Sequence, residues 1–342
     1  MAAVVNAHHG IANKPSKRVR ELIEDYPEPW KKVHRELLDA MAELCGADAV
    51  LTEVFRGGKL HQGVVEILTG LVVMADWVAS NENAFTLHVR GTQLERVEAA
   101  AAVIDVTTPW EPEMGEWGDI DKRFRHSFGW PEEFCARPVQ RAVVEAVQKL
   151  DGPALVVIEA ETGVGKTEAA LATAEVLAAR SGSQGVFFAA PTMATANGLL
   201  ERTIDWASNN SVDSVKSMYL AHSKNVLSEP YRELKFSQIG RDSGRGGGVI
   251  ASQWMSGRRL GLLSNFVVGT VDQVLMMALQ QRFHMLRHVG LAGKVIIFDE
   301  VHAFDTYTSD YLRSTIEWLG FYGASVILMS ATLPPEKRRT LV

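Results

Sequence analysis

The sequence predicts an α/β protein in which a helical N-terminal region precedes a parallel β-sheet covered by helices on both faces. Residues 1–106 show helical spacing of apolar residues and no convincing strand alternation. From about residue 131, short apolar runs alternate with helical segments, which is typical of a parallel sheet built from βαβ units. A chain of 342 residues is also long enough for two domains. We therefore predict a helical domain over 1–106, a linker over 107–130 and a sheet domain over 131–342.

Two helices stand out in the N-terminal region. The segment Val64–Ser80 is apolar nearly all round, so we expect a buried helix there. A second helix is expected over Leu94–Val106. Prolines and glycines then break the pattern between Thr107 and Pro131, and three tryptophans among them indicate a linker that packs on a surface.

The sheet domain contains five strand candidates and five helix candidates. The strand candidates are Leu155–Glu159, Gly185–Ala190, Phe266–Gly269, Val295–Asp299 and Ser325–Ser330. The helix candidates are Pro138–Leu150, Gly165–Arg180, Thr195–Ala207, Val271–Leu279 and Ser309–Leu319. Ligands of such a sheet gather at the carboxyl ends of its strands. The glycine-rich stretch Gly240–Gly248 is expected to be a surface loop.

Composition excludes several classes of protein. Apolar residues make up 46% and charged residues 22% of the chain, as in ordinary globular proteins. The net charge of −6 excludes a uniformly basic coat for nucleic acid but allows a local basic groove. Cys45 and Cys135 have no metal-ligand or redox spacing, which suits a reducing cytoplasm. No uninterrupted apolar run reaches the roughly 18 residues of a membrane span, so no membrane partner is expected.

The most informative motif is Ala160–Thr167, which reads AETGVGKT between an apolar run and an alanine-rich helical run. Glycines at 163 and 165 let the backbone N–H groups turn inward and form an anion nest at a helix N-terminus. Lys166 can then reach the β- and γ-phosphates, and the Thr167 hydroxyl can bind Mg²⁺. The residues expected to hold the nucleotide phosphates are Gly163, Val164, Gly165, Lys166, Thr167 and Glu168.

A second motif, DEVH, follows the strand candidate that ends at Asp299. Asp299 is expected to hold the same Mg²⁺ as Thr167, and Glu300 to orient and activate the attacking water. The two motifs therefore predict a nucleoside triphosphate and Mg²⁺ as cofactors, with Lys166, Asp299 and Glu300 as the catalytic set; the family resemblance given below implies that the nucleotide is ATP.

Further hydroxyl and amide residues follow other strands. Thr192 and Asn197 in PTMATAN, and Thr270 in VGTVDQ, suit contacts to a phosphate backbone without base reading. Ser330 and Thr332, in SAT, are placed to connect the acids with the nucleic-acid side. Ahead of the first strand, Gln140 in FCARPVQ has the paired hydrogen-bonding groups to read an adenine edge.

Taken in order, FCARPVQ, ETGVGKT, PTMATAN, VGTVDQ, DEVH and SAT resemble the first motor domain of superfamily 2 helicases over about residues 131–342. The set is similar to the helicase-nuclease family of type I CRISPR systems. That resemblance implies a RecA-like motor and a role in antiviral interference. It also implies single-stranded DNA and an RNA-guided surveillance complex as partners, and a cytoplasmic location. It further places Arg137 and Gln140 near the base, and Thr192 and Thr270 near the single strand.

The N-terminal residues bear on the same resemblance, because that family carries an HD phosphohydrolase domain ahead of the motor. His8 and His9 resemble its His-His element, and Asp76 in MADWVASN resembles its closing Asp. Asp76 is expected in the middle of a buried helix, where an unpaired carboxylate is costly and a metal would offset that cost. These three residues are the predicted ligands of a divalent transition metal in an HD nuclease site.

The departures from the family pattern set an expectation for activity. The first His and the His-Asp pair of the HD pattern are not found before His8, and no second motor domain follows Thr332. A missing arginine finger is worth on the order of 10³–10⁵ in rate. We therefore expect the chain to bind ATP and to hydrolyse it poorly alone. Two alternatives stay open: a superfamily 2 DNA translocase with an unrelated helical domain, and a non-catalytic or split subunit that needs a partner chain.

Overall fold

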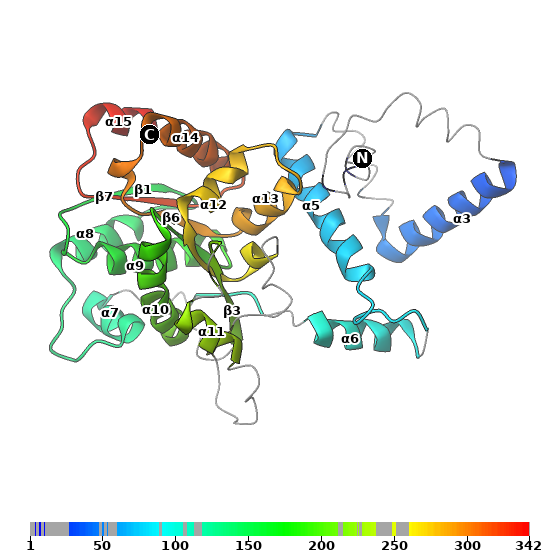
Figure 1. Ribbon diagram of the computed structural model, residues 1–342, viewed down its shortest axis with the longest axis horizontal. Coiled ribbons are helices and arrows are strands. Elements are labelled where there is room, and N and C mark those ends of the chain that lie inside the picture. The colour runs from blue at the N-terminus through cyan, green and yellow to red at the C-terminus, as the bar shows by residue number, and fades with distance from the viewer. Residues whose placement is uncertain are drawn as a thin grey trace.

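The protein was analysed as a computed structural model. The structure describes residues 4, 7, 10, 27–47, 50, 53, 60–88, 91–104, 108–112, 118–210, 215–223, 225, 228–236, 248–250 and 260–341. A larger body containing the sheet is joined to a smaller group of helices that contains the N-terminus (Figure 1). The predicted loop over Gly240–Gly248 lies outside the described residues except for its last residue.

The sheet has seven strands, all parallel, in the order β1-β7-β6-β2-β5-β3-β4. The strands are β1 (Leu155–Glu159), β2 (Val186–Ala190), β3 (Val215–Ala221), β4 (Gly248–Ile250), β5 (Phe266–Thr270), β6 (Val295–Phe298) and β7 (Val326–Ser330). Five of them lie where the sequence predicts strands, within one residue at either end. The prediction of a parallel α/β sheet is confirmed.

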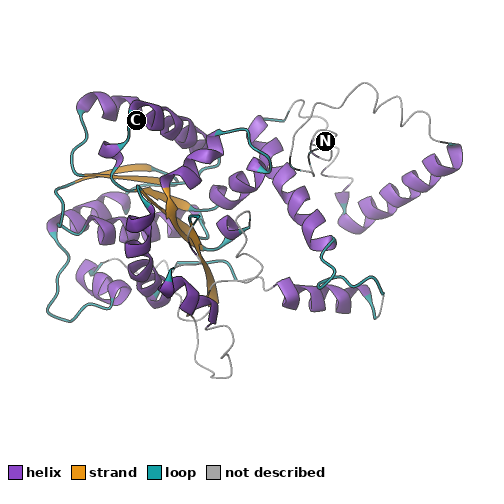
Figure 2. Ribbon diagram, viewed as in Figure 1, coloured by secondary structure: helices purple, strands orange, loops and turns teal. Residues whose placement is uncertain are grey.

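Helices cover both faces of this sheet (Figures 1 and 2). One face packs against α9 (Lys166–Ser181) and α10 (Met193–Asn209), outside which lie α7 (Ile120–Phe128) and α8 (Pro138–Val147). The other face packs against α12 (Val271–Leu275), which contacts α14 (Thr306–Phe321). The remaining helical elements of the described sheet domain are α11 (Glu229–Phe236), η4 (Gly261–Leu263), η5 (Met276–Ala278), α13 (His284–Ala292), η6 (Val301–Ala303) and α15 (Pro335–Leu341).

The central helix α9 is buried because its sequence is rich in alanine. It begins after Gly165 and ends before Gly182, both with positive φ, and eleven of its sixteen residues are buried. Alanine adds almost no volume, so the helix approaches β6 and β7 closely. This packing fixes the N-terminus of α9 at the carboxyl edge of the sheet.

The expected linker over 107–130 differs from the structure. Its last part forms α7, which is capped by the Asp119 carboxylate at one end and by Gly129 in a left-handed conformation at the other. Trp110 and Phe124 are fully buried in the core of the sheet domain. A buried ion pair joins Arg123 to Glu175 of α9. The prolines and glycines of this segment led to the prediction of a linker, whereas its described residues pack on the sheet domain.

Strand β3 and helix α13 were not predicted, because polar residues interrupt their apolar patterns. Lys216 in β3 is buried, and its ammonium group donates to the Pro109 carbonyl (2.6 Å) and the Thr108 hydroxyl (3.1 Å). Burial lowers the pKa of Lys216. The neighbouring Ser217 hydroxyl donates to the side chain of Asn265 over 3.0 Å. Tertiary partners therefore satisfy polar groups that a sequence pattern counts against a buried strand.

The N-terminal helices are α3 (Glu28–Cys45), α5 (Gln62–Ala79) and α6 (Gln93–Ile104). Only one side of α5 is buried, through Gly63, Glu66, Thr69, Gly70 and Val73, and that side meets α13. The expectation of a helix buried all round is therefore wrong. By length and composition alone α5 could cross a membrane, but Glu66 and Asp76 interrupt its apolar run and its buried side packs on α13.

Candidate functional site

The segment Ala160–Thr167 joins β1 to α9 at the carboxyl edge of the sheet, as predicted. Gly163 and Gly165 have φ of +86° and +87°, a region that other residues rarely adopt. A Cβ at Gly165 would lie 2.4 Å from the Gln140 side-chain nitrogen. Both conformation and space therefore require glycine at position 165. The strand, loop and helix context that a phosphate-binding loop needs is present.

Lys166 is buried and directs its ammonium group into the loop. The Nζ atom donates to the Ala160 carbonyl over 2.6 Å and to the Glu161 carbonyl over 3.2 Å. The ammonium group therefore donates its hydrogen bonds to backbone carbonyls. In a nucleotide complex, phosphate oxygens would accept these hydrogen bonds instead. A nucleotide that binds here must exchange these contacts for its own.

The two acids follow β6 directly. Asp299 is buried, and its Oδ1 accepts a hydrogen bond from the Glu300 backbone N–H over 2.9 Å. Burial, together with the neighbouring Glu300 carboxylate, raises the pKa of Asp299 to about 6. A divalent cation reverses such a shift, because it favours the charged carboxylate. Asp299 is thus a buried carboxyl group beside the phosphate-binding loop, and the positive charges near it do not fully offset the cost of burying its own charge.

Glu300 adopts a left-handed backbone conformation with φ of +52°. Non-glycine residues with such φ are uncommon and cluster at functional sites. The turn carries its carboxylate toward His302, whose Nδ1 lies 3.1 Å from Glu300 Oε2.

Lys166, Asp299 and Glu300 line one cavity of about 420 Å³, which is within the usual size range of ligand pockets. It brings together residues from the segment before α8, the phosphate-binding loop, α9, α10 and the end of β6. Its lining comprises Trp130, Phe134, Cys135, Arg137, Gln140, Thr162, Gly163, Gly165, Lys166, Thr167, Glu168, Arg202, Asp299 and Glu300. The structure therefore brings together the predicted nucleotide-site residues, apart from Val164, in one lining.

Arg137 and Gln140 are bonded to the phosphate-binding loop. The Arg137 guanidinium donates to the Gly163 carbonyl. Gln140 is 1% exposed; its Oε1 accepts from the Arg137 backbone N–H (2.8 Å), and its Nε2 donates to the Gly165 carbonyl (3.1 Å). Both ends of the Gln140 carboxamide are thus engaged within the protein. In this arrangement Gln140 supports the loop, and reading an adenine edge would require it to give up these bonds.

Ser330 lies between the loop and the acids, because β7 separates β1 from β6 in the sheet. Its hydroxyl donates to the Thr332 carbonyl over 2.9 Å and lies 3.4 Å from His302 Nδ1. His302 therefore contacts both Glu300 and Ser330. The predicted connection of Ser330 and Thr332 with the nucleic-acid side stays a prediction. The contact of Ser330 with the acids passes through His302, which was not assigned from the sequence although it stands in the DEVH motif.

The predicted nucleic-acid residues lie at the carboxyl ends of the neighbouring strands β2 and β5. Thr192 caps α10, where its exposed hydroxyl accepts from the Thr195 N–H over 3.1 Å. Asn197 is exposed, and its Oδ1 lies 2.9 Å from the Nε2 of His222. Thr270 ends β5 and is 8% exposed, and its contact with a single strand stays a prediction.

Of the three predicted HD ligands, only Asp76 lies among the described residues. His8 and His9 lie outside the described residues. Asp76 is exposed near the end of α5, so the expectation of a buried acid is wrong. Among the residues that the structure describes, no group of three His, Cys, Asp or Glu side chains is placed to hold a metal ion.

Three more residues around the cavity were not assigned to the site from the sequence. Trp130 and Phe134, whose ring centroids lie 6.1 Å apart, form one wall. Arg202 of α10 forms an ion pair with Glu168. Phe134 could have been found from the sequence, because it begins the FCARPVQ motif. Arg202 could not, because its place at the cavity depends on the packing of α10 beside α9.

Comparison with known proteins agrees with this geometry. A family profile for the DEAD/DEAH box helicase matches residues 137–341, and one for the Cas3 HD domain matches residues 1–85. The second match excludes the alternative of a helical domain unrelated to HD proteins.

Individual relatives cover the chain almost completely. The CRISPR-associated nuclease/helicase Cas3 of Streptococcus thermophilus is 40% identical over 294 residues, which is 83% of this chain and 31% of that protein. The crystal structure of T. fusca Cas3 with AMPPNP has a TM-score of 0.79 at 29% identity, covering 99% of this chain and 37% of that one. A chain in a structure described as a CRISPR RNA-guided surveillance complex before nicking has a TM-score of 0.61 at 25% identity, covering 99% and 33%. The chain thus spans about a third of the length of these relatives.

Proposed function

The chain belongs to the DEAD/DEAH box helicase family, and on that premise we propose that it is the ATP-binding first motor domain and adjoining HD region of a CRISPR helicase-nuclease. The observation that carries the proposal is the single cavity shared by Lys166, Thr167, Asp299 and Glu300. These are the residue types that phosphoryl transfer from ATP to water requires in one place. The similarity of the chain to Cas3 proteins supports the same assignment.

We assign a separate role to each group in the cavity. The N–H groups of the phosphate-binding loop and the Lys166 ammonium bind the β- and γ-phosphates. The Thr167 hydroxyl and the Asp299 carboxylate would hold Mg²⁺, which supplies charge neutralisation of the phosphate oxygens when it is bound. Glu300 orients the attacking water and accepts its proton. Trp130 and Phe134 offer the apolar wall against which a nucleobase can lie.

We propose that single-stranded DNA lies across the carboxyl ends of β2 and β5. Thr192 and Asn197 are exposed there, and the N-terminus of α10 offers backbone N–H groups to a phosphate. The buried Thr270 would contribute through its backbone at the start of α12 rather than through its hydroxyl. Ser330, Thr332 and His302 would connect this side with the ATP site. Binding through phosphates predicts an affinity that falls steeply as salt rises.

The nuclease activity, the surveillance-complex partner and a cytoplasmic location are proposed on similarity. The named Cas3 relative is a nuclease/helicase, and one similar chain belongs to an RNA-guided surveillance complex. His8, His9 and Asp76 remain the proposed ligands of a divalent transition metal. The arrangement of these ligands around a metal stays a prediction, because two of the three lie outside the described residues. A split subunit that acts with a partner chain also stays a prediction.

ATP hydrolysis by this chain tests the proposal. We expect slow release of phosphate that Glu300→Gln reduces on the order of 10²-fold or more, a usual contribution of a positioned general base. Nucleotide binding should persist in that variant. Glu201→Gln, an exposed acid on α10 outside the cavity, is the matched control and should hydrolyse like the wild type. Equal hydrolysis by Glu300→Gln and the wild type would overturn the role of Glu300.

A further inference from the structure

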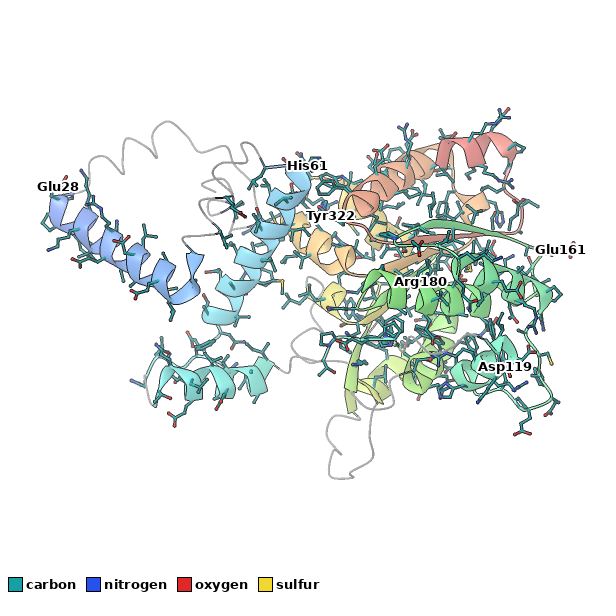
Figure 3. The ribbon with its side chains drawn as sticks, turned by 180° about the vertical axis from the view of Figure 1, so that it is seen from behind. Glu28, His61, Asp119, Glu161, Arg180 and Tyr322 are labelled. Carbon is teal, nitrogen blue, oxygen red and sulfur yellow. The ribbon has the colours of Figure 1, made fainter. Side chains whose placement is uncertain are left out.

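The contact between the N-terminal helices and the motor is close and specific. Figure 3 shows His61 and Tyr322 together where the start of α5 meets the motor. The His61 ring stacks on Phe321 with centroids 3.9 Å apart. A Cβ added at Gly63 would lie 2.1 Å from the Phe321 ring, and one at Gly70 would lie 2.9 Å from the Met285 carbonyl. Two glycines on one face of α5 therefore let its backbone lie directly on the motor.

A buried ion pair crosses this contact. Glu66 of α5 is 6% exposed, and its Oε2 lies 2.9 Å from Nε2 of His284, the first residue of α13. The other ring nitrogen of His284 lies 2.8 Å from the Gln281 carbonyl. Both ring nitrogens thus face acceptors, an arrangement that favours the imidazolium. The hydrogen bond to Glu66 raises the pKa of His284 against the effect of burial.

One turn further along α13, Arg287 forms hydrogen bonds to α12 rather than to α5. Its guanidinium donates to the Gln273 carbonyl over 2.6 Å and to the Gln273 side-chain oxygen over 3.3 and 3.4 Å. Gln273 lies in α12, which begins directly after Thr270 at the carboxyl end of β5. The short helix α13 is therefore bonded by charged side chains to α5 on one side and to α12 on the other.

We propose that Glu66, His284 and Arg287 are positioning residues, through which α13 transmits the position of α12 to α5. This inference rests on the proposed function, in which α12 lies beside the DNA strand. The segment that responds is the helix that carries Asp76, ten residues beyond Glu66 and about 15 Å further along α5 at 1.5 Å per residue. DNA held by the motor would in this way set the position of the proposed nuclease ligand.

The geometry favours transmission over mere adhesion. Charged hydrogen bonds fix a direction as well as a distance, and those of α13 lie on a single rigid turn. One side of α5 packs closely on α13, and the Glu66–His284 pair is a charged bond within that packing; the packing around the pair remains when the charge is removed. Removing one charged bond should therefore uncouple the helices without unfolding either body.

Hydrogen exchange of the chain, with and without an oligothymidylate, tests the link. In the wild type, DNA should slow exchange in peptides from both α12 and α5, the latter about fivefold or more, the lower end of typical coupling between sites. In Arg287→Met or Glu66→Gln, α12 should still respond and α5 should not. Arg35→Met, a change of an exposed residue on α3, is the matched control and should behave as wild type.

The outcomes separate two failures. If DNA changes neither helix in the wild type, the proposed DNA-binding surface is wrong and the link falls with it. If DNA slows exchange in α12 but not in α5 of the wild type, DNA binding stands and the link through α13 is overturned. The same conclusion follows if α5 responds to DNA as strongly in both variants as in the wild type. Because the readout is the change caused by DNA within each protein, a general loss of stability in a variant does not imitate the result.

Discussion

Nδ1 of His302 lies 3.1 Å from Oε2 of Glu300 and so holds the carboxylate that we assign to the attacking water. The same nitrogen lies 3.4 Å from the hydroxyl of Ser330 at the end of β7. Glu300 has a left-handed backbone conformation, which few non-glycine residues adopt and which sets the direction of its side chain. The turn and His302 together therefore set the position of the Glu300 carboxylate.

Replacing His302 by alanine should slow ATP hydrolysis while leaving nucleotide affinity unchanged. The carboxylate of Glu300 would lose a hydrogen bond that orients it, and we expect a loss on the order of tenfold, or about 1.4 kcal/mol in the barrier. Phosphate release at saturating ATP checks the rate, and calorimetry checks the affinity. A rate equal to that of the wild type would remove His302 from the site.

Gly63→Ala should destabilise the contact between α5 and the motor, because the new methyl group would lie 2.1 Å from the Phe321 ring. Overpacking of this kind typically costs about 1–3 kcal/mol. Chemical denaturation followed by circular dichroism measures the loss. The matched control is Gly320→Ala in α14, where a Cβ meets nothing within 4 Å. That change should instead stabilise the protein by up to about 1 kcal/mol, since alanine favours helices over glycine. Equal effects at the two positions would contradict the described packing.

The stability of the chain should fall in mild acid partly through His288. Its Nδ1 lies 2.8 Å from the Tyr322 hydroxyl, and burial lowers its pKa to about 4, with Glu66 opposing and His284 adding to the shift. Between pH 6.5 and 4 the unfolded state binds a proton on this imidazole that the folded state does not. The free energy of unfolding therefore decreases as the pH falls through that range, by about 2 kcal/mol between pH 7 and pH 5.

His288→Asn should remove much of that acid sensitivity, because asparagine can still donate to Tyr322 but does not titrate. The measurement is the free energy of unfolding of both proteins at pH 7 and pH 5. His284, whose pKa is shifted the other way by Glu66, is present in both proteins and opposes the loss in each. If both proteins lose the same stability on acidification, His288 is not buried as described.

The parallel sheet and most of the residues that line the cavity could be predicted because their signals are local. Gly163, Gly165 and Lys166 lie within four residues of one another between an apolar strand and a helix, and Asp299 follows an uninterrupted apolar run. Periodicity and spacing are enough to recognise such segments.

The rest depends on contacts between distant segments. Strand β3 was not predicted because it contains the polar residues Lys216 and Ser217. Their hydrogen-bond partners, Pro109 and Asn265, are remote in sequence. Similarly, the exposure of Asp76 depends on which side of α5 meets the motor, and an all-round apolar pattern does not tell one side from another. The ion pair between Glu66 and His284 could not be predicted, because it depends on how α5 and α13 pack together.

Calorimetric titration of the chain with a non-hydrolysable ATP analogue in the presence of Mg²⁺ tests the central claim most directly. We predict saturable binding of one nucleotide by the wild type and by Lys149→Ala, a change of an exposed lysine outside the cavity. Lys166→Ala should show no measurable binding, because it removes the cation that faces the phosphates. Unchanged nucleotide affinity in Lys166→Ala, or no binding by the wild type, would contradict the assignment of this cavity as an ATP site.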